Sequence, residues 1–236
     1  IIIPLRFFIF TYQIVQYSER IVNAICKLKI FIFYFLTFFA PRYILLSVRK
    51  KAVVFLAKIK LGIRVCINVG IAAALMAVCS WISVPLIVPF TMQTFAVFTI
   101  VGLLGIWQGT CAVCVYIALG AIGVPVFSGF RGGPAKLAGP TGGYIIGFIA
   151  LALVMGAVIK IKPESRLWAF VGMALGLFAC YAFGSAWFYF VYAGKGEARS
   201  LWSILLSCVF PYLLPDAAKA VLSDMIVRRC KKYINK

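Results

Sequence analysis

Two residues of opposite charge, Asp216 and Lys219, lie three positions apart in a mostly apolar part of the sequence. On a helix this spacing places both side chains on one face. Charged groups in an apolar helix are costly, and they usually face a partner or a water-filled cavity, so a bound polar ligand would explain the pair. A structural role is the alternative: Pro215 would start a helix, Asp216 would favour its positive end, and Lys219 would neutralise Asp216. The spacing alone leaves both interpretations open.

Other residue types that support catalysis are sparse. Ser185 lies in a Gly-Ser-Ala sequence weakly similar to that of membrane serine proteases, but the chain has no His to activate it. The five acidic residues form no metal-binding pattern, and no Walker A sequence is present. Cys111 and Cys114 form a C-x-x-C without a second pair at a zinc-like spacing. We therefore expect no enzyme activity, no cofactor and no metal, and any energy for transport would come from another subunit.

The composition predicts an integral membrane protein. Of the 236 residues, 64% are hydrophobic and 12% are charged, which suits helices that face lipid. The formal net charge of +19 raises the possibility of nucleic-acid binding. However, Lys and Arg gather at the ends of apolar segments, as in cytoplasmic loops of membrane proteins, and not on a solvated element. We therefore expect the lipid bilayer, and no nucleic acid, as the partner of this basic chain.

The apolar segments predict an all-α fold with six transmembrane helices. A spanning helix needs about 20 mostly apolar residues. From residue 61 onward the predicted spans are 65–86, 91–107, 109–126, 142–161, 167–192 and 215–227. Residues 61–236 would form this membrane domain. Residues 1–60 contain none of the 20 glycines and precede the first Met, Met76. We interpret them as an extension of unknown role, either an extra helix near 30–48 or a wrongly assigned start.

The distribution of Lys and Arg predicts the orientation of this domain. Basic residues cluster in 49–64, in 160–166 and in 228–236, and six spans place these three segments on one side. By the positive-inside rule, both ends of the 61–236 core would be cytoplasmic in a bacterial cell membrane. The Gly/Pro-rich loop 127–141, between the third and fourth helices, and the segment 193–215 would then lie outside, where they could cover one site.

The glycine-rich outer loop can approach a ligand through its backbone, although such loops often only turn the chain. Five aromatic residues near it could form the apolar wall of a pocket, although aromatic residues also belt the membrane interface. These residues are Phe127, Phe130, Tyr144, Trp187 and Tyr192.

Small residues recur every four positions in three predicted spans, which lets helices approach closely in lipid. They are Ala73 and Ala77; Gly139, Gly143 and Gly147; and Gly172, Gly176, Cys180 and Gly184. Such residues usually pack inside a protein. On the first span, Ala73 and Ala77 could instead dock another membrane subunit.

Several motifs together resemble the BioY family over about residues 65–230. They are Val-Pro-Phe-Thr-Met-Gln-Thr at 88–94, Gly-Ala-Ile-Gly-Val-Pro-Val-Phe at 120–127, Gly-Gly at 132–133, Gly-Pro-Thr-Gly-Gly-Tyr at 139–144 and Pro-Asp-x-x-Lys at 215–219. The BioY family comprises the substrate-binding (S) subunits of energy-coupling-factor biotin importers. The resemblance implies a six-helix subunit that binds biotin from outside with high affinity. It also implies a membrane coupling (T) subunit and two cytoplasmic ATPase subunits as partners.

Site residues follow from the same resemblance. Motif positions make Gln93, Arg131, Tyr144, Asp216 and Lys219 the expected ligand neighbours. The resemblance also gives Ala73 and Ala77 the role of a small face that contacts the coupling subunit.

The chemistry of biotin agrees with these residue types. Asp216 can accept from the ureido N–H groups, Lys219 or loop donors can meet the ureido carbonyl, and Arg131 or Lys136 can meet the tail carboxylate. The reverse orientation is also open. Other readings are an S component for thiamin or riboflavin, or a membrane subunit without a ligand, in which Asp216 and Lys219 form only an internal ion pair.

Overall fold

The computed structural model describes residues 42–84, 88, 90–194 and 200–234, with side chains described for residues 62–232 within these ranges. The chain divides into two compact units, Ile1–Ile71 and Ala72–Lys236, which we treat separately. Of the first unit, the structure describes part of helix α2, which runs without a break from Arg42 to Trp81. The sequence boundary proposed at residue 60 therefore falls inside a helix. Most of the possible extra helix at 30–48 lies outside the described residues.

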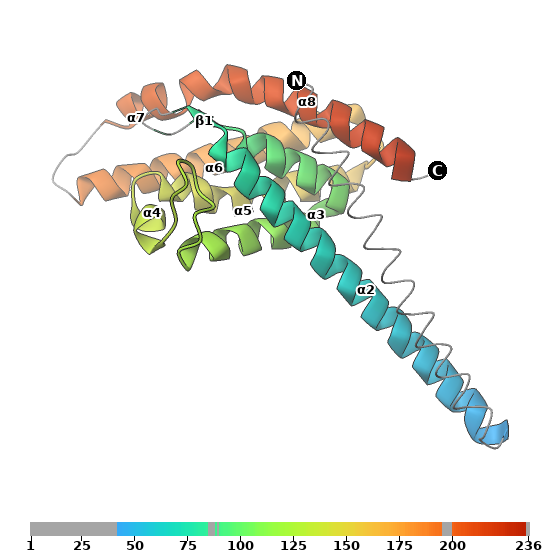
Figure 1. Cartoon of the computed structure of the whole chain (residues 1–236). Coiled ribbons are helices and arrows are strands. Elements are labelled where there is room, and N and C mark those ends of the chain that lie inside the picture. Colours follow the sequence, from blue (N-terminus) through green and yellow to red (C-terminus); the bar gives the residue numbers. More distant parts are fainter. Residues whose placement is uncertain (1–41, 85–87, 89, 195–199, 235–236) are drawn as a thin grey trace. The chain divides into compact units, whose positions relative to one another are not determined.

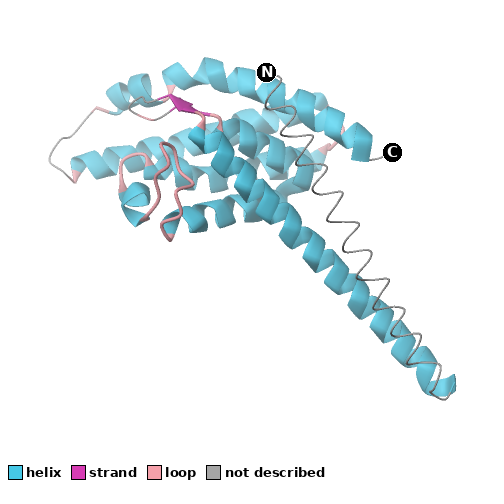
Figure 2. Cartoon of the chain, viewed as in Figure 1, coloured by secondary structure: helices cyan, strands magenta, loops and turns pink. Residues whose placement is uncertain are grey.

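The second unit is almost entirely helical (Figures 1 and 2). After the end of α2, its elements are β1 (Ser83–Val84), β2 (Phe90–Thr91), α3 (Gln93–Ala121), α4 (Pro134–Ala138), α5 (Gly142–Ile161), α6 (Arg166–Ala193), α7 (Leu201–Cys208) and α8 (Phe210–Ile234). The two short strands pair antiparallel, with Ser83 opposite Thr91 and Val84 opposite Phe90.

Helix α3 is two helices joined by a reversal at Gly105. The backbone of Gly105 has φ 77° and ψ −179°, a conformation that only glycine adopts readily because it has no Cβ atom. A Cβ atom added to Gly109 would lie 3.0 Å from the Cα of Val101, so the chain has folded back on itself. The amide of Gln93 also donates to the hydroxyl of Tyr116, whereas 23 residues of straight helix would separate them by about 35 Å. The two halves form an antiparallel pair of spans.

The all-α, six-helix membrane fold is confirmed. Among the described residues, five helical stretches are long and apolar enough to cross a membrane, and one of them is the whole of α3. Because α3 reverses at Gly105, it supplies the predicted second and third spans. The predicted span 142–161 agrees with α5, and 167–192 differs by one residue at each end from α6. The third span ends at Ala121 instead of residue 126, so residues 122–126 belong to the loop.

The predicted start of the last span was wrong. Helix α8 begins at Phe210, and Pro215 lies inside it. Pro215 therefore does not start a helix, and Asp216 is not in the first turn, so the dipole argument for Asp216 fails. Pro215 removes only the hydrogen bond to the carbonyl of Pro211, which lies in the first turn of the helix, and membrane helices tolerate such interior prolines.

Close helix packing in the second unit depends on the small residues of α5 and α6. A Cβ atom on Gly143 would lie 2.2 Å from the Cβ of Trp187, and one on Gly184 would lie 2.2 Å from the ring of Tyr144. A Cβ atom on Gly176 would lie 2.9 Å from the backbone oxygen of Leu151. These positions admit no side chain, so the glycine stripes pack inside the bundle and set the spacing of α5 and α6.

Candidate functional site

A cavity lies where the start of α3, the loop before α5, and helices α6 and α8 meet. Its polar lining comes mainly from Thr91, Gln93, Thr94, Lys136, Asp216 and Lys219. Its apolar lining includes Tyr144, Phe148, Tyr181 and Tyr212. An apolar pocket with a few converging polar groups is the usual form of a small-molecule site.

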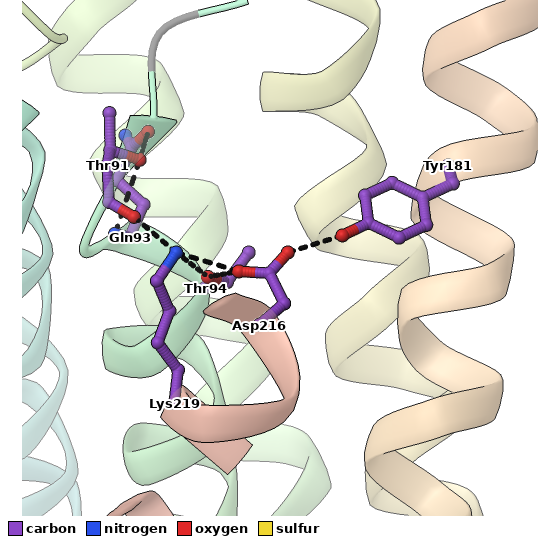
Figure 3. Close-up of polar contacts among 6 residues, drawn as sticks. All are labelled: Thr91, Gln93, Thr94, Tyr181, Asp216 and Lys219. Carbon is purple, nitrogen blue, oxygen red and sulfur yellow. Dashed lines mark hydrogen bonds and ion pairs between the residues drawn. The ribbon is translucent and has the colours of Figure 1, made fainter. Parts of the chain in front are cut away.

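Asp216 and Lys219 form a buried ion pair at this cavity (Figure 3). The Nζ atom of Lys219 lies 2.7 Å from Oδ1 of Asp216, and the two side chains are only 6% and 4% exposed. The helical spacing predicted that the two residues share a face, and the structure confirms it. Charges buried this deeply are stable only when each has partners, so the surrounding contacts decide what the pair can do.

Lys219 uses all three of its donors. Besides Asp216, it donates to the backbone oxygen of Thr91 at 2.7 Å and to the hydroxyl of Thr94 at 3.1 Å. Its ammonium also lies 4.0 Å from the centre of the Phe90 ring, a cation–π distance. Lys219 thereby ties α8 to the strand and loop that lead into α3.

Asp216 is held from three helices. Its Oδ1 accepts from Lys219 and, at 2.9 Å, from the hydroxyl of Thr94 on α3. Its Oδ2 accepts from the hydroxyl of Tyr181 on α6 (Figure 3). A carboxylate has about four acceptor positions, so Asp216 retains capacity for one more donor, such as a ligand N–H.

Gln93 lines the cavity and also links its parts. Its side-chain oxygen accepts from the hydroxyl of Thr91 at 3.0 Å, and its amide donates to the hydroxyl of Tyr116. Tyr116 in turn donates to the backbone oxygen of Val126 at 3.1 Å, at the start of the glycine-rich loop. Gln93 therefore connects the polar floor of the cavity to this loop.

Tyr144 forms part of the cavity wall. It is buried in an apolar cluster with Phe188, Ile204 and Cys208. Its hydroxyl and that of Ser185 lie 3.1 Å apart. Ser185, considered above as a nucleophile, thus lies next to a tyrosine in a chain without His.

Arg131 and Lys136, the two candidates for the tail carboxylate, have different positions. Lys136 lines the cavity, whereas Arg131 is exposed and does not line it. The backbone of Arg131 pairs with that of Phe127 in an isolated bridge. Partial burial, followed by the nearby positive charge of Arg131, lowers the pKa of Lys136 below its usual 10.5. Of the two candidates, Lys136 is therefore the one at the cavity.

The aromatic residues expected to wall the pocket mostly hold the loop. The indole of Trp187 donates to the backbone oxygen of Gly139 at 3.1 Å. Phe127 is buried and packs edge-on against Tyr116, with ring centres 5.6 Å apart. Phe130 is exposed and stacks on Trp81. Of the five predicted aromatic residues, Tyr144 lines the cavity, and Tyr192 packs against the cluster behind it.

Sequence reasoning missed three polar residues of the site: Thr91, Thr94 and Tyr181. The two threonines stand in the Phe-Thr-Met-Gln-Thr motif, which supports the family resemblance but by itself gives neither threonine a role. Tyr181 lies in an apolar span, 35 positions before its partner Asp216, and no local pattern indicates that contact.

Ala73 and Ala77, the predicted docking face, are buried, with 2% and 7% of each residue exposed. Their burial favours the internal packing that was the alternative. The neighbouring Ala74 is exposed. Within the described residues, no three His, Cys, Asp or Glu side chains are placed to hold a metal ion.

Comparisons with known proteins agree with this architecture. The sequence model of the BioY family matches residues 50–236. The chain belongs to the BioY family. Its relatives include the biotin transporter BioY of Thermotoga maritima, which is 41% identical over 167 residues, covering 70% of this chain and 95% of that protein. The biotin transporter BioY of Rhodobacter capsulatus is 33% identical over 175 residues, covering 70% of this chain and 92% of that protein.

A solved membrane-protein structure shares the fold. The crystal structure at 2.1 Å of the S-component for biotin from an ECF-type ABC transporter is 26% identical and superposes with a TM-score of 0.65. The superposition covers 73% of this chain and 93% of that one. The BioY match begins at residue 50, inside α2, and leaves residues 1–49 outside the family region.

Proposed function

We propose that this BioY-family protein captures biotin from the outer side of the membrane and imports it as the S component of an energy-coupling-factor transporter. The names of its relatives and of the superposed structure support biotin as the substrate. The observation that carries the proposal is the buried pair of Asp216 and Lys219 at a partly apolar cavity.

The groups at the cavity match the two ends of biotin. The free acceptor position of Asp216 suits a ureido N–H, and the hydroxyls of Thr94 and Tyr181 beside it hold the carboxylate in place. Tyr144 and Phe148 offer apolar contact for the fused rings and the aliphatic tail. Lys136, in the short helix α4, would meet the tail carboxylate.

The charge of the cavity supports biotin over thiamin. The lining contains one carboxylate, Asp216, and two ammonium groups, Lys136 and Lys219. Its net positive charge favours an anionic ligand and disfavours the cationic thiamin. Riboflavin lacks a carboxylate and would leave Lys136 without a ligand partner.

The orientation and the partners are part of the proposal. Six spans bring both ends of the 61–236 core to one side, and the basic residues near those ends support a cytoplasmic location. Because the sequence contains no nucleotide-binding loop, we assign the energy to two cytoplasmic ATPases, linked through a membrane coupling subunit. We assign no catalytic step to the chain.

The direct test is calorimetric binding by the purified full chain. Biotin is expected to bind, and thiamin and riboflavin are not. Biotin amide, which lacks the tail charge, serves as a matched ligand and should bind more weakly because it cannot form the charged contact with Lys136. Tight binding of thiamin or riboflavin without biotin binding would assign the subunit to another vitamin. Binding of none of them would favour a membrane subunit without a ligand.

A further inference from the structure

A second cavity lies at the other end of α8 from the biotin site. Its lining includes Asp224, Arg228, Lys231 and Lys232 of α8 and Glu164 from the connection between α5 and α6. Asp224 lies eight residues after Asp216, or about 12 Å further along the helix. The proposed biotin site makes no use of these residues.

Asp224 holds two arginines: Arg228, which lines this cavity, and Arg166, which does not. Its Oδ2 accepts from Nε of Arg166 and its Oδ1 accepts from Nε of Arg228, each at 2.9 Å. The side chain of Asp224 is 3% exposed, while those of Arg166 and Arg228 are 60% and 40% exposed. The buried carboxylate of Asp224 therefore holds both guanidinium groups through their Nε atoms.

The outer nitrogens of both guanidinium groups remain available. Within the described part of the chain, the Nη groups of Arg166 and Arg228 make no hydrogen bond to protein. Lys231 and Lys232 lie in the last turn of α8 and line the same cavity. Arg166, Arg228, Lys231 and Lys232 carry four positive charges against two negative charges from Asp224 and Glu164, so the net charge here is positive. Planar Arg donors fixed side by side suit the oxygens of a phosphate group.

The surroundings of this cavity are those of the membrane interface. It lies beside the end of α5 at Ile161 and the start of α6 at Arg166. Ile161 and Leu167 next to it are 62% and 71% exposed, although both are strongly apolar. Ile159, Met173 and Val227 give the cavity an apolar base. A molecule with a charged headgroup and apolar chains uses both surfaces, whereas a free phosphate uses only the charged one.

We propose that this basic cavity, lined by Arg228, Lys231 and Lys232 and flanked by Arg166, binds the headgroup phosphate of an anionic phospholipid. The acyl chains would lie along the exposed apolar residues at the ends of α5 and α6. The net positive charge selects an anionic headgroup over a zwitterionic one. The site is independent of biotin binding.

The test is lipid retention by the purified full chain in detergent, measured by native mass spectrometry during titration with phosphatidylglycerol. Replacing both Lys231 and Lys232 with Gln should lower the affinity roughly thirtyfold, at about a fivefold loss per basic residue near the membrane surface. R229Q is the matched control, because Arg229 is exposed and adjacent but does not line the cavity. It should retain the lipid as the unmodified chain does.

Further comparisons make the result decisive. The melting temperature without added lipid should be the same in all three proteins, since neither lysine pairs with Asp224. R166Q should also lose phosphatidylglycerol while Arg228 still pairs with Asp224. Equal retention of phosphatidylcholine or phosphatidylethanolamine, equal loss in R229Q, or displacement by millimolar inorganic phosphate would each overturn the proposal. The first two indicate non-selective binding, and the third a site for free anions.

Discussion

Replacing Asp216 with Asn keeps the shape of the side chain and removes its negative charge. In the native protein this carboxylate accepts from Thr94, Lys219 and Tyr181. Both carboxylate oxygens of Asp216 accept from donors. In Asn, one oxygen can still accept, but the NH₂ group that replaces the other oxygen would face a donor. Lys219, with only 6% of its side chain exposed, would lose its counter-charge.

The sizes of the losses in biotin affinity and in folding stability separate a binding role from a structural one. Losing one charge-assisted hydrogen bond to the ligand should cost about 1.5–3 kcal/mol, or roughly ten- to more than a hundredfold in biotin affinity. Removing one partner of a buried ion pair costs about 3–5 kcal/mol of folding stability when the other charge stays unpaired. We expect Asp216→Asn to lower both quantities, since the structure gives the pair internal partners as well as a place at the cavity. Lys219→Met should behave similarly.

The double variant Asp216→Asn/Lys219→Met decides between the roles. It removes both charges, so the melting temperature should partly recover relative to either single variant. If the pair contacts the ligand, biotin affinity should stay low despite this recovery, and the two losses of affinity should be non-additive. Calorimetric titration and thermal unfolding of the same four proteins measure both effects. Unchanged biotin affinity in Asp216→Asn, or full recovery of affinity in the double variant, would refute the assignment of Asp216 and Lys219 to the site.

Three more results are expected. The affinity for biotin should fall as the pH rises through the lowered pKa of Lys136, because the protonated ammonium meets the carboxylate. Lys136→Gln should weaken binding about tenfold at neutral pH and flatten this pH profile. If binding titrations show the same pH profile in Lys136→Gln, Lys136 does not meet the carboxylate. Ala73→Leu should lower the melting temperature of the isolated subunit, because overpacking at this buried position costs about 1–3 kcal/mol. Ala74→Leu is the control and should leave the melting temperature unchanged, because Ala74 is exposed. A stable Ala73→Leu protein that binds biotin but fails to import it would restore the docking role. A chain that lacks residues 1–60 and starts with an added Met should still bind biotin, because the candidate span Gly62–Trp81 and the residues that line the cavity all follow residue 60. Loss of folding in a thermal melt would show that residues 1–60 are required.

Local sequence properties determined the class of fold. Continuous apolar segments of this kind cross lipid as helices, because a helix satisfies every backbone N–H and C=O within the segment, and the lengths of the segments set how many can cross. The predicted spans 91–107 and 109–126 placed the break between two helices at residue 108, three residues from the reversal at Gly105. The start of α8 was missed because Pro215 reads as a helix start, although a proline near the beginning of a longer helix costs little when one carbonyl loses its partner.

For the candidate site too, local sequence patterns predicted some features and the tertiary structure decided the others. The three-residue spacing of Asp216 and Lys219 was enough to predict a shared face, since helical periodicity is local. That Thr94 and Tyr181 complete their contacts, and that Lys136 instead of Arg131 lines the cavity, was decided only by the tertiary structure. The same holds for Ala73 and Ala77, whose spacing predicts a common face but not its direction. Periodicity fixes which residues share a side of a helix, whereas the rotation of that helix depends on packing against partners remote in the sequence.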